Sequence, residues 1–537
     1  MSSRSSVGGD MHVRLRRAGF IFAVCGLAAS AVAAANDLRV VEAARNDDRD
    51  AVHSLLKQHA NVNGVQADGT TALAWAAYND DVQLAESLIA VGAKVDAVND
   101  YGIGALWLAC ANGSSAMVEA LLRARVNVAI PQWSGATPLM MCAKTGNVAA
   151  VKAILARGPK VNVAERAHGQ TALMWATSKQ HQAVVGALIA AGANVNASTK
   201  GGVTALMLAA QQGDIESARL LLDAGANINA ATTTAATWVG DTPLLLAAAS
   251  GHEELAIFLL DHGARPDAAD EWGYTALHYS MMHALADVAG VRIPDDTWAT
   301  YLFRPDMPSL VRALLAHGAN PNARIAKYGG ANKLLSSRKD DPSKFQVYEV
   351  GATPFLLAAF ANDVEIMRLL VKGGADPNLA TVGKTTPLME AAGLTRRRSL
   401  AGGGGHSVQL TPEQMSAALE AVKLCVELGA DVNAVNDVGL TALHGAAFNG
   451  SDDLVRYLVA QGAHLDARDA TGQTPLDKAM GARPKAGVNF KPNGHDVFLA
   501  YNGWPSTVAL LKQLGAKPGD GAPAAKPAAV ASIRVHE

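Results

Sequence analysis

The chain has 537 residues, which is enough for roughly three or four compact domains or for one long repeat array. Half of the residues are apolar and 18% are charged, so the composition excludes disorder throughout the chain. Lys and Arg number 46 against 48 Asp and Glu, and the resulting formal charge of −2 argues against nucleic acid as the main partner.

The first 35 residues have the pattern of a cleavable export signal. Three arginines between positions 14 and 17 precede an apolar run at residues 18–29 and a small-residue stretch at residues 33–35. The run is short and rich in Ala and Gly compared with the roughly 20 apolar residues that cross a membrane. We therefore expect cleavage after Ala35, a periplasmic or secreted product, and no stable membrane span afterwards. The alternative is a retained membrane anchor.

A tripeptide reading Thr-Ala-Leu or Thr-Pro-Leu recurs along the rest of the chain, most often 33 residues apart. Its starts, with two variants and a degenerate first copy included, lie near residues 38, 71, 104, 137, 171, 204, 242, 275, 353, 386, 441 and 474. A second motif, L-x-x-G-A-x-x-N or close to it, places its glycine 21 residues after most of these starts. Such a period is typical of repeats that stack because none can bury its apolar face alone.

Each repeat predicts two helices joined by a short loop. The Thr of the tripeptide is a good helix N-cap and Pro is tolerated at the next position, as in Thr137-Pro138. The glycine of the second motif, for example Gly225, suits the left-handed conformation that ends a helix. We expect an all-α solenoid of about 12 helix-turn-helix repeats with hairpin-like turns over residues 36–517, followed by a disordered tail at 518–537.

Together the two motifs resemble the ankyrin repeat family, and the predicted signal makes the chain most similar to its bacterial-type exported members. The family pattern G-x-T-P-L-H-x-A-A followed by L-L-x-x-G-A-D-x-N is nearly spelled out by residues 439–447 and 458–466. The resemblance implies a non-enzymatic scaffold that binds proteins through a concave face of turn tips and first helices. The family's histidine survives only at His278 and His444, and residues such as Met140 replace it elsewhere. There we expect softer apolar packing instead of its hydrogen bonds.

Extra length is concentrated in the C-terminal half, in insertions near residues 287–307, 324–346, 394–414 and 482–503. Because long loops are tolerated and often carry function, we expect this decorated half to take part in binding. One alternative is a small-molecule or glycan site, or an unrecognised hydrolase, built by the insertions of repeats 8, 10 and 12. It would require His406, His495, Asp496, Asp295 and Asp296 to converge. A second alternative is a passive envelope spacer.

The sequence shows no recognisable catalytic, metal or cofactor motif, so we predict no enzyme activity, no metal and no cofactor. His278 and His283 are five residues apart, which is off the spacing that places two ligands on one helical face. Cys110 and Cys142 fall on the first helices of adjacent repeats, where other repeats carry Ala. We expect both to be small buried residues and not a disulfide.

We expect the protein partner, whose identity the sequence does not give, to bind scarce aromatic side chains at turn tips, on first helices and in insertions. These candidates are Tyr78, Tyr101, Trp133, Trp238, Trp272, Trp298, Phe360, Phe448 and Trp504. Aromatic residues are enriched where protein surfaces bind. The alternative is that each ring packs on its own or the next repeat.

Overall fold

The computed structural model describes residues 37–233, 239–281, 307–326, 350–394, 411–481 and 503–519. Within these residues it contains 24 helices, and extended pairing is limited to isolated bridges at the turns. The predicted all-α repeat fold is therefore confirmed. The predicted export signal, most of the predicted insertions and the tail from residue 520 lie outside the described residues.

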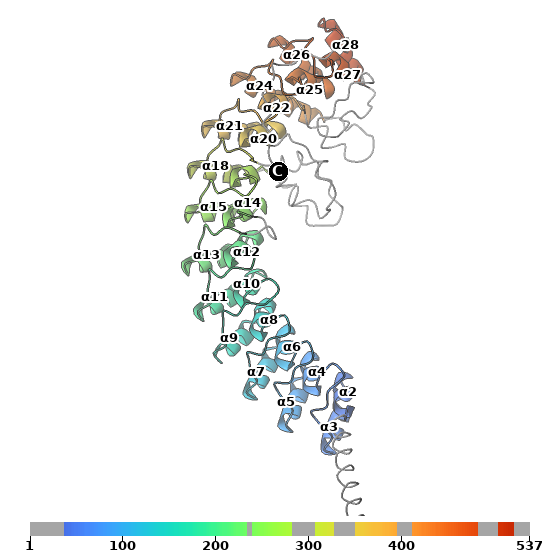
Figure 1. Ribbon diagram of the computed structural model, residues 1–537, viewed down its shortest axis with the longest axis vertical. Coiled ribbons are helices and arrows are strands. Elements are labelled where there is room, and N and C mark those ends of the chain that lie inside the picture. The colour runs from blue at the N-terminus through green and yellow to red at the C-terminus, as the bar shows by residue number, and fades with distance from the viewer. Residues whose placement is uncertain are drawn as a thin grey trace, which may run out of the picture. The chain divides into compact units, whose positions relative to one another are not determined.

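The helices alternate between two positions in each repeat, which Figure 1 shows as two parallel columns within each part of the array. The first helices are α2 (Arg39–Arg45), α4 (Ala72–Tyr78), α6 (Ala105–Ala111), α8 (Pro138–Thr145), α10 (Ala172–Thr177), α12 (Ala205–Gln212), α14 (Pro243–Ala249), α16 (Ala276–Tyr279), α20 (Pro354–Ala361), α22 (Pro387–Ala391), α25 (Ala442–Phe448) and α27 (Pro475–Ala479). The second helices are α3 (Arg49–Lys57), α5 (Val82–Ala90), α7 (Ser115–Arg123), α9 (Val148–Leu155), α11 (Gln182–Ala190), α13 (Ile215–Asp223), α15 (Glu253–Asp261), α18 (Pro308–Ala316), α21 (Val364–Lys372), α24 (Pro412–Glu427), α26 (Asp452–Ala460) and α28 (Pro505–Gln513).

Two compact units make up the chain: residues 1–209 with 216–227, and residues 210–215 with 228–537. In the first unit, α2, α4, α6, α8 and α10 pack in order against one another, as do α5, α7, α9 and α11. In the second unit, the same holds for α14, α16, α20, α22, α25 and α27 and for α15, α18, α21, α24, α26 and α28. The repeats that these helices form thus bury their apolar faces on their neighbours, as stacked repeats must.

Threonine side chains begin most of the first helices. Thr71 Oγ1 accepts the N–H of Ala74 at 3.1 Å, and Thr353 Oγ1 accepts that of Leu356 at 3.2 Å. Each bond satisfies one of the N–H groups that have no partner inside the helix. The tripeptide therefore marks the helix start for a local reason that recurs with the repeat.

Six asparagines, each in the segment after a second helix, tie their repeat to the next. Asn63 Nδ2 donates to the Gly92 carbonyl at 3.0 Å, and Asn63 Oδ1 accepts the N–H of Lys94 at 2.8 Å. The same pair of bonds is made by Asn162, Asn196, Asn229, Asn322 and Asn433. These side chains bond the backbone of the glycine that follows the next second helix and of the residue two positions later, which explains the Asn in the second motif.

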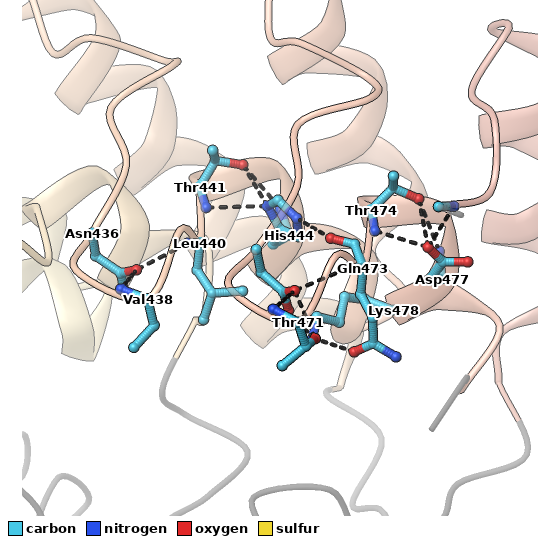
Figure 2. A network of polar contacts seen from close by, with 12 residues as sticks. Asn436, Val438, Leu440, Thr441, His444, Thr471, Gln473, Thr474, Asp477 and Lys478 are labelled. Carbon is cyan, nitrogen blue, oxygen red and sulfur yellow. Dashed lines mark hydrogen bonds and ion pairs between the residues drawn. The ribbon is translucent and has the colours of Figure 1, made fainter. Parts of the chain in front are cut away.

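The histidine after the tripeptide links neighbouring turns at His444 (Figure 2). The Thr441 N–H donates to His444 Nδ1 at 3.1 Å, and His444 Nε2 lies 3.2 Å from the Gln473 carbonyl of the next repeat. Burial lowers the pKa of His444 to about 4. Methionine keeps half of this arrangement, because Met140 Sδ accepts the N–H of Thr137 at 3.4 Å. The expectation of purely apolar packing is corrected to that extent.

Cys110 and Cys142 form a disulfide between α6 and α8, with their Cα atoms 4.4 Å apart. The prediction that they would remain unpaired was wrong. Other repeats carry alanine at these positions, for example Ala76 and Ala77, and these small side chains let adjacent first helices approach closely. The same close approach brings the two sulfur atoms within bonding reach. Cys425 is free and buried, and burial raises its pKa to about 12.

Candidate interaction surface

Backbone hydrogen bonds hold consecutive turns of the first unit side by side. They run from one turn to the next, from Asp100 N–H to Asp68 O at 2.8 Å, Trp133 N–H to Tyr101 O at 2.9 Å, Arg166 N–H to Ser134 O at 2.7 Å and Lys200 N–H to His168 O at 2.9 Å. Each donor and acceptor in these bonds is a backbone group, so the bonds use none of the side chains at the turn tips. The turns therefore present one continuous row of side chains.

Two large aromatic side chains stand next to each other in this row. Tyr101 is 58% exposed and Trp133 is 69% exposed. The next two turns place Arg166, His168 and Lys200 at the surface. The row thus changes along the chain from aromatic to basic.

A second row lies on the first helices, four residues after each repeat start. It is apolar and half-buried and consists of Trp75, Leu108, Met141, Trp175 and Leu208. Trp75 Nε1 donates to Gln66 Oε1 and Trp175 Nε1 donates to Gln170 Oε1, each at 3.0 Å. Both glutamines belong to turns, so this side of each first helix faces the turns.

The ends of the first helices complete the surface. Tyr78 meets Trp75 edge to face with ring centroids 5.4 Å apart, and Arg45 Cζ lies 5.8 Å from the Trp75 ring centroid. Lys144 Nζ lies 5.6 Å from the ring centroid of Trp175. We call the two rows and these helix ends the turn face.

Positive charge predominates on one part of the turn face. The described stretches 131–146, 164–180 and 197–209 contain the cations Lys144, Arg166, Lys179 and Lys200, all exposed. Glu165 is the single acidic residue within them, and it is buried. Although burial opposes it, hydrogen bonds from the backbone N–H groups of residues 167, 168 and 170 lower the pKa of Glu165. The Glu165 carboxylate is buried and hydrogen-bonded within its own turn, so the exposed charges of these three stretches are all positive.

Sequence reasoning placed part of this surface. Tyr78, Tyr101 and Trp133 are exposed on the turn face, and Phe448 is half-buried at the end of α25. Trp238 and Trp298 lie outside the described residues. The basic residues were missed because they are scattered in the sequence. Comparing the charge of equivalent positions, repeat by repeat, would have found them.

Two of the predicted residues are interior. Trp272 is 8% exposed and Phe360 is 1% exposed, so neither side chain is available to a partner. The Trp272 N–H donates to Asp270 Oδ1 at 2.9 Å, and its carbonyl accepts the N–H of Ala326 at 2.7 Å, which fixes that turn between its neighbours. Phe360 occupies the same register position as exposed Tyr78, so register alone did not distinguish them.

Trp504 is half-buried and contributes to the array itself. Its Nε1 donates to the Phe448 carbonyl at 2.9 Å, and its ring packs against Gly450. The Phe448 carbonyl belongs to the last turn of α25, where helical partners run out. The indole therefore caps that helix from the next repeat, as Asn112 does for the carbonyl of Tyr78 at 2.8 Å.

A pair of buried carboxyl groups in the second unit is an alternative candidate site. Burial and the nearby charge of Asp270 raise the pKa of Asp241 to about 8. Asp270 Oδ1, however, accepts the N–H groups of Trp272 and Tyr274, each at 2.9 Å. Asn99 makes the same pair of turn bonds at the equivalent position. Asp270 is therefore a turn residue, whose carboxylate is used within its own turn.

Neither a metal site nor a membrane span is found in the described residues. Among them, no group of three His, Cys, Asp or Glu side chains is placed to hold a metal ion. None of the helices in the described part of the chain combines the length and apolar character that crossing a bilayer requires. His406, His495, Asp496, Asp295 and Asp296 lie outside the described residues.

Comparison with known families gives a consistent match. A family model described as ankyrin repeats in three copies matches residues 40–131, 73–165, 114–199, 139–232, 206–291 and 414–490 in overlapping windows. A second model, described as ankyrin repeat, matches residues 350–382. These matches cover more than half of the chain.

Individual relatives share only the repeats. Alpha-latroinsectotoxin-Lt1a of Latrodectus tredecimguttatus is 35% identical over 147 residues, which is 27% of this chain and 9% of the toxin. Human ankyrin repeat and SOCS box protein 16 is 30% identical over 235 residues, which is 37% of this chain and 51% of that protein. Human protein phosphatase 1 regulatory subunit 27 is 43% identical over 63 residues, 12% of this chain and 41% of that protein. The matched part of this chain thus spans about half of these proteins' length or less.

Among solved structures, the human ASB11 ankyrin repeat domain is similar, with 28% sequence identity and a TM-score of 0.36. The match covers 41% of this chain and 96% of that domain.

Proposed function

The chain belongs to the ankyrin repeat family, and we propose that it is a non-enzymatic scaffold that binds another protein through the turn face. The family is generally an interaction module without catalytic activity. The observation that carries the proposal is the adjacent, highly exposed pair Tyr101 and Trp133. Large aromatic side chains are enriched among the residues that dominate binding energy.

The turn face suits such binding because its backbone is already ordered. The turns that carry Tyr101 and Trp133 are joined by a backbone hydrogen bond of 2.9 Å. A partner therefore does not have to order these loops, which lowers the cost of association. The half-buried row beneath, from Trp75 to Leu208, adds apolar area that a partner can cover.

The scaffold is proposed to act after export, in the periplasm or outside the cell. The signal-like pattern of residues 1–35 supports this location. The Cys110–Cys142 disulfide also supports it, because disulfides persist mainly in oxidising compartments. Mass spectrometry of the chain purified from its own cells should find Asn36 at the N-terminus and a bonded cysteine pair. An intact N-terminus with Cys110 and Cys142 as free thiols would contradict export.

Capture of partner proteins by the immobilised chain tests the binding proposal. The Tyr101→Ala, Trp133→Ala double variant should recover much less of any captured protein than the unmodified chain. Val91→Ala is the matched control, because Val91 is 51% exposed and follows the second helix α5. Equal recovery by the double variant and the control would contradict a role for the turn face.

A further inference from the structure

We infer that the turn face of the repeats starting at 137, 171 and 204 binds an extended acidic segment of the partner protein that carries an apolar side chain at every third residue. This inference rests on the proposed function and adds the chemistry of the partner. It follows from two rows of side chains that run along the same three repeats.

The first row supplies positive charge. Lys200 Nζ donates to the Arg166 carbonyl at 2.6 Å, and Arg166 Nη1 donates to the Trp133 carbonyl at 3.3 Å. These bonds hold both cationic groups along the line of turn tips. Lys144 and Lys179 lie at the ends of the first helices of the same repeats. Since the carboxylate of Glu165 is used within its turn, the four cations face no acidic side chain of the described stretches around them. Such a row attracts carboxylates of a partner.

The second row supplies apolar contact at a regular spacing. Met141, Trp175 and Leu208 are half-buried, and each comes from one repeat. Packed helices lie about 8–10 Å apart. A polyproline-type segment has three residues per turn and rises about 9.3 Å over them, so every third side chain points the same way at a matching spacing. One such segment can place successive apolar side chains on successive repeats.

A protein segment fits this surface better than a nucleic acid strand. Bases bind single-strand sites by stacking on aromatic rings. Met141 and Leu208 offer no ring, and Lys144 already lies 5.6 Å from the Trp175 ring centroid. A segment with one carboxylate and one apolar side chain in every three residues can satisfy both rows together.

Fluorescence anisotropy with labelled 12-residue probes tests the inference on the full chain. The main probe has four Glu-Pro-Leu units. The comparison probes have four Lys-Pro-Leu units, four Glu-Pro-Ser units, or twelve thymidylates. If both rows contribute, the Glu-Pro-Leu probe should bind saturably. The Lys-Pro-Leu and Glu-Pro-Ser probes should then bind with about tenfold or more lower affinity. No binding of the Glu-Pro-Leu probe, or equal binding of the Glu-Pro-Ser or oligothymidylate probe, would overturn the inference.

Charge-reversal variants locate the binding. The double variant Lys179→Glu, Lys200→Glu should bind the Glu-Pro-Leu probe with about tenfold or more lower affinity. Lys57→Glu with Lys152→Glu changes the net charge equally, on exposed residues of second helices α3 and α9, and should change affinity less than about twofold. Equal losses in the two variants would place the binding elsewhere. Circular dichroism of both variants checks that they are folded.

Failure of this inference is distinguishable from failure of the proposed function. If the Tyr101→Ala, Trp133→Ala variant loses a captured protein while the Glu-Pro-Leu probe does not bind, the scaffold function stands and the acidic segment is wrong. If neither measurement depends on the turn face, both proposals fail.

Discussion

Replacing Cys110 and Cys142 together by alanine should destabilise the first unit substantially, although both positions accept alanine in other repeats. Each sulfur is fully buried, and the equivalent positions of the repeat starting at 71 are the buried residues Ala76 and Ala77. The change therefore leaves little unfilled space. Its main consequence is loss of the covalent link between α6 and α8.

The magnitude follows from the length of chain that the disulfide closes. The two cysteines are separated by 32 residues. The chain-entropy relation gives about 3.7 kcal/mol at 25 °C for a loop of that size, within the usual range for disulfides. This is a large part of the stability of a typical domain, so the difference should be easy to measure.

Urea unfolding followed by circular dichroism, with and without reductant, measures this effect. The unmodified oxidised chain should unfold at a higher urea concentration than the Cys110→Ala, Cys142→Ala variant, and reductant should bring the two curves together. Cys425→Ala is the control, because this buried thiol is free and its loss removes no cross-link. If the oxidised chain and the double variant unfold at one midpoint with one slope, the two thiols are not bonded in solution.

Three further predictions concern the repeats. Gly225→Ala should lower the free energy of unfolding by about 1 kcal/mol, because Gly225 has φ +85° and open space around it. Gly102→Ala should lower it by about 1–3 kcal/mol more, because the new Cβ would lie 2.7 Å from the backbone of the next turn. Equal shifts in urea midpoint for the two variants would refute this packing. Burial lowers the pKa of both His278 and His444 to about 4 from an ordinary 6.5, so the folded state favours their neutral form. Each should contribute about 3 kcal/mol to the free energy of unfolding above pH 6.5, and this contribution should be lost as pH falls toward 4. Replacing both by Met should flatten the dependence of the urea midpoint on pH across that interval, and an unchanged dependence would show that they are not buried in the neutral form. Asn433→Ala removes two hydrogen bonds to the next repeat, at 3.0 and 2.8 Å, and should lower the free energy of unfolding by about 1–2 kcal/mol, whereas an unchanged midpoint would mean that water replaces both bonds without loss.

The repeat fold was predictable because its signals are local. Thr71 caps its helix through a bond to a residue three positions later, and Gly225 adopts the left-handed conformation that the motif requires. Neither depends on distant parts of the chain. The link that Asn63 makes to the next repeat recurs with the period, so it too could be expected once the period was known.

The interaction surface was only partly predictable from the sequence. Whether a side chain is exposed depends on the residues packed around it, and its position within the repeat does not specify these. Tyr78 and Phe360 hold equivalent positions, yet Tyr78 is 57% exposed and Phe360 is buried. The disulfide between Cys110 and Cys142 was missed for a similar reason, since the approach of α6 to α8 is a property of packing. Spacing in the sequence placed these cysteines on adjacent helices but could not give the distance between them.

Site-specific photo-cross-linking can show whether the partner protein lies on the turn face, as we propose. A photoreactive phenylalanine analogue is placed at Trp133 in one chain and at Val91 in another, both exposed positions of the first unit. Each chain is irradiated together with the captured partner. We expect a covalent adduct with the partner from position 133 and none from position 91. Adducts from position 91 alone would place the partner on the other side of the repeats and contradict the claim.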